Sequence, residues 1–185
     1  MIVELVKTQT RDGVRLDGAI TRESVNAASD VASDSKPTGL IVCLHGVGSN
    51  FYGSTMMNVL AEGLHSEQWD VLRVNTRGHD YCYVGSFKMG VRRFGSGYET
   101  VADCIHDIAA WVQWAEHAGY ERVVLLGHSL GAIKTVFSQS QEMSNLVVAV
   151  LAISPPRLEH ETFRVGERSG EFRASFSAAE NLIAQ

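Results

Sequence analysis

The feature that most constrains the fold is a short apolar run followed at once by a serine between two glycines. Residues 123–126 are Val-Val-Leu-Leu, the pattern of a buried strand, and residues 127–131 are Gly-His-Ser-Leu-Gly. A helical pattern follows at residues 132–141. Glycines two positions either side of a residue let strand and helix backbones pass very close to each other. The stretch therefore predicts a strand, a sharp turn and a helix.

Ser129 lies on this turn, which pushes its hydroxyl out beyond the end of the strand. The amide of Leu130, at the start of the helix, then points to where a negatively charged oxygen would sit. Ser129 is the candidate nucleophile, and Gly127 and Gly131 are the residues that support the turn. The alternative is an ordinary glycine-rich turn without chemistry. The ring of His128 is expected to point away from the hydroxyl, so we interpret His128 as structural.

Composition limits the classes of protein to consider. A chain of 185 residues with 45% hydrophobic content can bury one sizeable core, which predicts one main domain. The net charge is −5 and the basic residues are scattered, so neither nucleic acid nor a membrane is an expected partner. Cys43, Cys82 and Cys104 are odd in number and have no ligand-like spacing, which favours free thiols in the cytoplasm. The sequence predicts neither a cofactor nor a metal site.

The chain alternates strand and helix patterns after an opening hairpin that turns at Asp12-Gly13. Strands are predicted at residues 2–8, 14–21, 39–44, 71–75, 123–126 and 146–153, and helices at 54–66, 98–118, 132–141 and 177–183. Residues 24–38 are interpreted as a surface loop and residues 76–97 as a long glycine-rich functional loop. The fold class is therefore α/β, with a mostly parallel sheet and helices on both faces.

Polar segments follow four of the predicted strands, at residues 45–48, 75–80, 127–131 and 154–156. Carboxyl ends of parallel strands meet at one edge of a sheet, where ligands bind in such folds. We therefore expect the four segments to form one site. Within it, Arg77 to Asp80 are interpreted mainly as structural, with substrate binding as the alternative, and Arg92-Arg93 as a solvated surface pair.

Three of these segments together resemble the α/β-hydrolase superfamily over residues 1–156. They are the His-Gly-x-Gly turn at 45–48, the Arg-Gly-His at 77–79 and the Gly-His-Ser-Leu-Gly turn at 127–131. The resemblance implies that Ser129 is the nucleophile and that the amides of Val47 and Leu130 form the oxyanion hole. It also implies that His45 and Gly46 shape the turn that aims Val47. Residues 1–156 would be the N-terminal part of the hydrolase core, and residues 157–185 the start of a cap or connecting segment.

The sequence departs from the family after Ser129. The family places its acid and its histidine base after later strands, in the order Ser, Asp or Glu, His. Here one clear strand at 146–153 and a polar tail follow, so the fold lacks its last strands and neither residue can be placed. His160 follows that strand too closely and is flanked by Glu159 and Glu161, which indicates a surface segment.

Two hypotheses about function remain from the sequence. The first is a serine hydrolase that cleaves a small-molecule ester, thioester or amide through Ser129, with the base and acid supplied from outside this segment. The second is a non-catalytic binding protein with a hydrolase fold. Residues 146–153 are all apolar, as in an interior strand, so we expect a continuation of the polypeptide or a second chain to pair with them and to bring the base and acid.

Overall fold

The computed structural model describes residues 2–22, 38–64, 66 and 69–183. The chain divides into two compact units, residues 1–155 and 156–185. The predicted surface loop at 24–38 lies outside the described residues except for Thr38. Among the described helices, none is long and apolar enough to cross a membrane.

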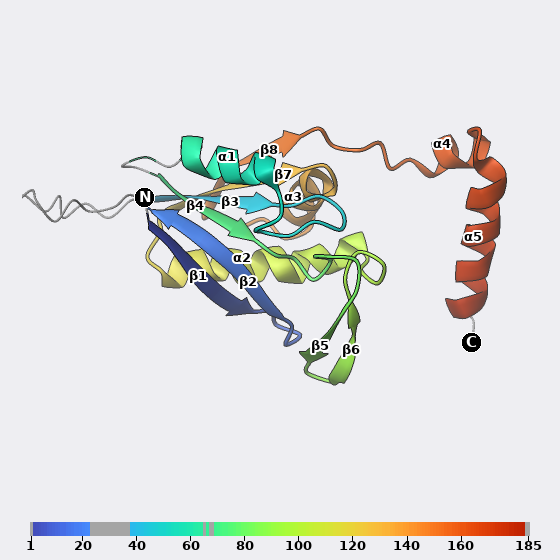
Figure 1. The fold of residues 1–185 in the computed structure, drawn as a ribbon, viewed down its shortest axis with the longest axis horizontal. Helices are drawn as coiled ribbons and strands as arrows, with labels where there is room; N and C mark the ends of the chain where they lie inside the picture. Colours follow the sequence, from blue (N-terminus) through green and yellow to red (C-terminus); the bar gives the residue numbers. More distant parts are fainter. Residues whose placement is uncertain (1, 23–37, 65, 67–68, 184–185) are drawn as a thin grey trace, which may run out of the picture. The chain divides into compact units, whose positions relative to one another are not determined.

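A six-stranded sheet forms the centre of the first unit, with the strand order β1-β2-β4-β3-β7-β8 (Figure 1). The strands are β1 (Ile2–Gln9), β2 (Arg15–Arg22), β4 (Trp69–Val74), β3 (Gly39–Leu44), β7 (Arg122–His128) and β8 (Val147–Ile153). β1 and β2 form the predicted antiparallel hairpin, and β2 pairs antiparallel with β4. The remaining pairs are parallel, so β4, β3, β7 and β8 all end at the same edge of the sheet. We call this the carboxyl edge.

The central strand β3 shows why helices cover both faces of the sheet. Its six residues are all buried, and successive side chains enter opposite cores. Leu40, Val42 and Leu44 join the core that contains α2 (Cys104–His117). Ile41 and Cys43 join a second core with α1 (Thr55–Leu64), on the other face (Figure 1). The α/β fold with a mostly parallel sheet is therefore confirmed.

The prediction for residues 76–97 was wrong in one respect, because this segment contains a β-hairpin. Strands β5 (Tyr83–Phe87) and β6 (Gly90–Phe94) pair antiparallel and form a separate two-stranded sheet (Figure 1). Tyr83, Phe87 and Phe94 pack against the larger core, which anchors one face of the hairpin. The alternation is short, and glycine and arginine interrupt it, so the period-two signal is weak in the sequence.

Two predicted helix boundaries were also wrong. The helix expected from residue 98 begins as a 3-10 turn, Val101–Asp103, and becomes the α-helix α2 at Cys104. The second unit contains α4 (His160–Val165) and α5 (Ser169–Ile183), where only residues 177–183 were expected to be helical. Phe163 and Phe172 stack in this unit with ring centroids 5.7 Å apart. Such packing between two helices does not appear in the periodicity of either helix alone.

Arg77 fastens the loop after β4 to two other parts of the first unit. Its guanidinium is 1% exposed, donates to Asp107 of α2 at 2.9 Å, and donates twice to Asp12 of the β1–β2 turn at 2.8 and 3.0 Å. Although partial burial opposes it, hydrogen bonds from Arg77 and Thr10 lower the pKa of Asp12 to about 2. This interaction therefore contributes stability above pH 3.8, which is lost as the pH falls toward 2. The contacts agree with the structural interpretation of this segment.

Strand β8 ends the sheet and has side chains exposed on both of its faces. Val148 is 55% exposed and Leu151 is 48% exposed, although the strand consists of Val, Ala, Leu and Ile alone. Its neighbour β7 is largely buried. An apolar edge strand of this kind is a template for pairing with another strand. A further strand that paired with β8 would therefore extend the sheet.

Candidate active site

The carboxyl edge of the sheet is where the backbone is most strained. Among the described residues, three that are not glycine have positive φ: Asp80 at 55°, Ser129 at 54° and Ser154 at 46°. They follow β4, β7 and β8, so all three lie beyond the carboxyl ends of parallel strands. Strain of this kind persists only where the surrounding structure enforces it, and it is concentrated at functional sites. The prediction that the polar segments meet at one edge is confirmed by the strand order.

Ser129 occupies the turn between β7 and α3 (Leu130–Gln141). Its backbone has φ 54° and ψ −123°, a conformation unfavourable for any residue with a side chain. Its amide donates to the carbonyl of Ile153 at 3.0 Å, and its carbonyl accepts from Ala132 at 3.0 Å. The turn is thus held by β8 on one side and by the first turn of α3 on the other. Ser129 is partly exposed rather than buried in the core.

The two glycines of the turn leave no space for a side chain. A Cβ on Gly127 would lie 2.2 Å from the carbonyl oxygen of Gly131, and a Cβ on Gly131 would lie 2.6 Å from the carbonyl oxygens of Leu44 and His45. All of these contacts are with backbone atoms, which cannot swing aside. Glycine at both positions is therefore what lets α3 begin against the ends of β7 and β3.

The turn after β3 lies directly against Ser129. A Cβ on Gly46 would be 3.1 Å from the Cβ of Ser129. The amide of Ser49 donates to the Gly46 carbonyl at 3.3 Å, and Gly48 adopts φ 65°, as a tight turn requires. Val47, between them, has its side chain 62% exposed, so the functional candidate at this position is its backbone amide. Leu130 is the first residue of α3, where helix amides lack partners within the helix.

His45 is a buried structural histidine with both ring nitrogens engaged. It is 3% exposed; Nδ1 lies 2.7 Å from the carbonyl oxygen of Gly46, and Nε2 accepts from the amide of Thr76 at 3.3 Å. This arrangement requires the neutral ring with its proton on Nδ1. Burial lowers the pKa of His45 to about 4, in spite of the hydrogen bond to Gly46. The ring therefore holds the Gly46 turn and is not placed to take a proton from Ser129.

We expect His45 to make the stability of the protein depend on pH. The folded state keeps its ring neutral down to about pH 4, whereas the ordinary pKa is 6.5. The unfolded chain binds the extra proton first, so about 3 kcal/mol of stability is lost as the pH falls from about 6.5 to about 4. Urea unfolding at several pH values measures this slope. His45→Asn should flatten this slope, and an unchanged slope in His45→Asn would contradict the assignment.

A second histidine at this edge carries a carboxylate partner. Nδ1 of His79 lies 2.8 Å from Oδ2 of Asp80, and the ring stacks on Tyr83 with centroids 4.1 Å apart. Asn50 donates to the other oxygen of Asp80 at 2.7 Å. Although partial burial opposes it, the hydrogen bonds from Asn50 and His79 lower the pKa of Asp80. Asn50 has only a weak signal in the sequence, which is its place after a glycine-rich turn.

Within the described residues, no histidine is hydrogen bonded to the hydroxyl of Ser129. His45 and His79 have the partners given above. The ring of His128 lies beside the Gly46 turn, since its Nδ1 would be 3.6 Å from a Cβ there. His160 begins α4, and its side chain lies outside the described part of the chain. The structure thus brings Ser129 together with Gly127, Gly131 and Gly46, and no histidine of the described residues is bonded to its hydroxyl.

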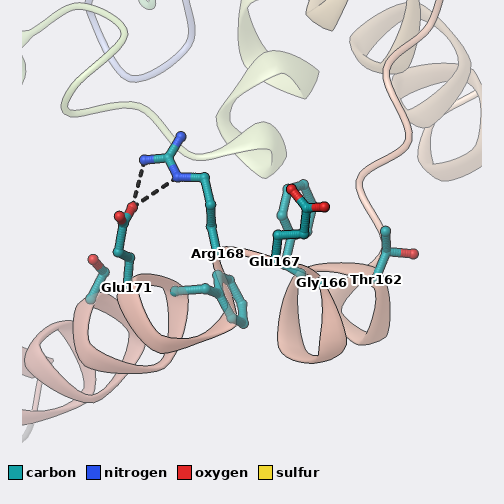
Figure 2. Close-up of a pocket in the computed structure, with 8 residues that line it drawn as sticks. Thr162, Gly166, Glu167, Arg168 and Glu171 are labelled. Carbon is teal, nitrogen blue, oxygen red and sulfur yellow. Dashed lines mark hydrogen bonds and ion pairs between the residues drawn. The ribbon is translucent and has the colours of Figure 1, made fainter.

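The second unit contains a pocket of its own between α4 and α5 (Figure 2). Its lining is Thr162, Phe163, Gly166, Glu167, Arg168, Glu171, Phe172 and Ser175. Arg168 pairs with Glu171, one helical turn further along, at 2.6 Å (Figure 2). Both side chains are exposed, and such pairs contribute little. No residue of the Ser129 turn lines this pocket.

A family model described as the alpha/beta hydrolase family matches residues 41–184. The match covers most of the chain, including the Gly46 turn and the Ser129 turn. The chain belongs to the alpha/beta hydrolase family. No curated protein sequence shows significant similarity to it.

Several solved structures share its fold. The esterase Pf2001 of Pyrococcus furiosus is 23% identical with a TM-score of 0.63, over 95% of this chain and 61% of that one. Est1E of Butyrivibrio proteoclasticus, solved with ferulic acid bound, is 19% identical with a TM-score of 0.64, over 88% and 57%. The hydrolase GrgF of Penicillium sp. sh18 is 15% identical with a TM-score of 0.64, over 100% and 56%. The present chain thus spans little more than half the length of these structures.

Proposed function

We propose that this chain is the nucleophile-bearing part of a serine hydrolase that acts on a small-molecule carboxylic ester, with thioester and amide as the related alternatives. Ser129 Oγ attacks the carbonyl carbon, and the resulting oxyanion accepts hydrogen bonds from the amides of Val47 and Leu130. The base from the completing segment takes the hydroxyl proton of Ser129 and gives it to the departing alcohol, thiol or amine, and water then hydrolyses the acyl-enzyme on Ser129. Buried thiols at Cys43 and Cys104 support a cytoplasmic location.

The strained backbone of Ser129 is the observation that carries this proposal. A φ of 54° at a serine has no value for packing, because glycine would adopt it without strain. The Cβ of Ser129 lies beside the Gly46 turn, 3.1 Å from the position that a Cβ on Gly46 would take. Two structural neighbours carry the name esterase or bind ferulic acid, which supports an ester as the substrate class.

The general base and the acid come, in this proposal, from polypeptide that completes the sheet. The apolar edge strand β8 is the expected attachment, because no described strand pairs with its outer side, where Val148 and Leu151 are exposed. A strand paired there would continue the carboxyl edge and bring its following loop to the Ser129 side. Either a continuation of the same polypeptide or a second chain meets this requirement. Residues 157–185 then begin a cap or connecting segment.

The alternative is a binding protein that keeps the hydrolase fold without turnover. One observation favours it: within the described residues, no histidine is bonded to the Ser129 hydroxyl. The His79–Asp80 pair, supported by Asn50, would serve such a role by holding a polar ligand at the carboxyl edge. This alternative predicts an unreactive serine.

A fluorophosphonate probe distinguishes the two functions. We expect slow labelling of Ser129 in the 185-residue chain and labelling faster by about 10²- to 10⁴-fold once a completing segment supplies the base. Mass spectrometry of the intact protein and its peptides locates the adduct, with the exposed Ser140 as an internal control and heat-denatured protein as the blank. A folded, completed protein that stays unlabelled would favour the binding alternative. Rapid labelling of the 185-residue chain alone would contradict an external base.

A further inference from the structure

A lysine is buried beneath the candidate active site, which is unusual for an ammonium group. Lys134 lies on α3, five residues after Ser129, and is 1% exposed. Its Nζ donates to Glu99 Oε2 at 2.6 Å and to Thr76 Oγ1 at 3.1 Å. Removing an ammonium from water is unfavourable unless partners replace the lost hydration. The proposed chemistry does not use this group directly.

The contacts of Lys134 continue to the turn that carries Val47. Thr76 is fully buried; its hydroxyl lies 3.5 Å from Nε2 of His45, and its amide donates to the same nitrogen at 3.3 Å. Nδ1 of His45 lies 2.7 Å from the carbonyl oxygen of Gly46. A continuous chain of polar contacts therefore joins α3 to the Gly46 turn. We call this chain, from Glu99 through Lys134, Thr76 and His45 to Gly46, the buried relay.

Glu99 is buried with one carboxylate oxygen unsatisfied in the described part of the chain, which does not favour the stability of the fold. Its side chain is 6% exposed, and its Oε1 has no hydrogen-bond partner within the described residues. Its carboxylate packs on Gly78, where a Cβ would lie 1.8 Å from the carboxyl carbon. A buried ion pair with an unsatisfied oxygen is a poor device for stability, because an apolar pair of similar size often does as well. The arrangement calls for another explanation.

We propose that Lys134 and Glu99 are positioning residues for the oxyanion hole. The two donors of the hole come from separate segments, Leu130 from α3 and Val47 from the turn after β3. Donors must be held within about 0.5 Å of the productive geometry to act on a developing charge. The buried relay links the helix that carries one donor to the turn that carries the other. This inference rests on the proposed function, and it adds the residues that set its geometry.

The test compares Lys134→Met with the double variant Lys134→Met/Glu99→Gln, using p-nitrophenyl acetate hydrolysis by the completed protein. The single variant leaves a buried carboxylate unpaired, so both its melting temperature and its kcat should fall. The double variant removes that charge and should regain the melting temperature, while kcat stays about 10- to 100-fold low and KM changes by less than about threefold. Recovery of both quantities would reduce the pair to a structural role and overturn the inference.

A second measurement does not depend on turnover. Amide hydrogen exchange of residues 45–48 should be about tenfold faster in both variants, because the turn loses its link to α3. Unchanged exchange would also overturn the inference. If the proposed function is wrong, the protein without substitutions will show no turnover. The two variants will still exchange the amides of residues 45–48 faster than that protein does.

Tyr120→Phe is the matched control. In the parent protein, the Tyr120 hydroxyl donates to buried Asp70, which lies near the amino end of β4 and away from the carboxyl edge. The variant should lower the melting temperature while leaving kcat and the exchange of residues 45–48 unchanged. An equal loss of kcat in Tyr120→Phe would mean that destabilisation alone explains the effect, against the inference.

Discussion

Replacing Ser129 with alanine is expected to abolish covalent labelling by a fluorophosphonate and to lower kcat by about 10⁴- to 10⁶-fold, because the attacking oxygen is lost. The fold should be retained, since the side chain of Ser129 donates no hydrogen bond to the described residues that hold the turn. Circular dichroism and urea unfolding check the fold, and esterase assay with intact-mass measurement checks the chemistry. Turnover that survives in Ser129→Ala would place the nucleophile elsewhere.

Ser129→Gly is the matched variant, and it should separate strain from chemistry. Both variants lack the hydroxyl, but only glycine adopts φ 54° and ψ −123° without strain. We expect Ser129→Gly to be more stable than Ser129→Ala by about 1 kcal/mol, in the range typical of a strained backbone. Equal stability of the two variants would mean that the turn stores no strain at this position.

The second large effect is expected from Gly131→Ala. The new methyl group would lie 2.6 Å from two backbone carbonyl oxygens, those of Leu44 and His45. Neither can move without breaking the end of β3, so we expect a loss of at least about 3 kcal/mol in the free energy of unfolding. Urea unfolding measures this loss where the variant folds, and soluble yield reports it where the variant does not.

Gly63→Ala is the control for this substitution. Gly63 is on the exposed side of α1, and a Cβ there would meet no atom within 4 Å among the described residues, apart from its chain neighbours and the backbone of its own helix. Alanine favours a helix more than glycine does, so this variant should be neutral or more stable by up to about 1 kcal/mol. A Gly131→Ala protein as stable as the parent would show that α3 can shift away from β3, contrary to the close packing described above.

The fold and the sharp turn at Ser129 were predictable because their signals are local. Residues 39–44 and 123–126 are continuous apolar runs, and the glycines at 127 and 131 mark a close approach of two backbones. The same locality explains the failures. The β5–β6 hairpin depends on Tyr83 and Phe94 packing against a core assembled from distant residues. No short window of sequence contains that information.

The electrostatic part of the site was even less accessible from sequence. Lys134 lies in a pattern that predicts a helix, and a lysine there is ordinarily solvated. Its burial follows from Glu99 and Thr76, which are 35 and 58 residues away in the sequence. His45 was predicted as a turn-shaping residue from a family resemblance, whereas its low pKa follows from burial against Thr76. The burial of Lys134 and the low pKa of His45 therefore arise only when distant segments meet at the carboxyl edge of the folded sheet.

The exposed side chain of Val47 has an evolutionary consequence. The groups proposed to stabilise the oxyanion at this edge are main-chain amides, held by glycine contacts and by a buried histidine. Side chains that face outward from the same turns are therefore free to diverge without disturbing the donors, proline excepted because it lacks the amide hydrogen. Proteins built in this way can change the side chains that contact the ligand, while the main chain that holds the donors stays the same. Relatives at 15% to 23% identity with a shared fold are the expected result.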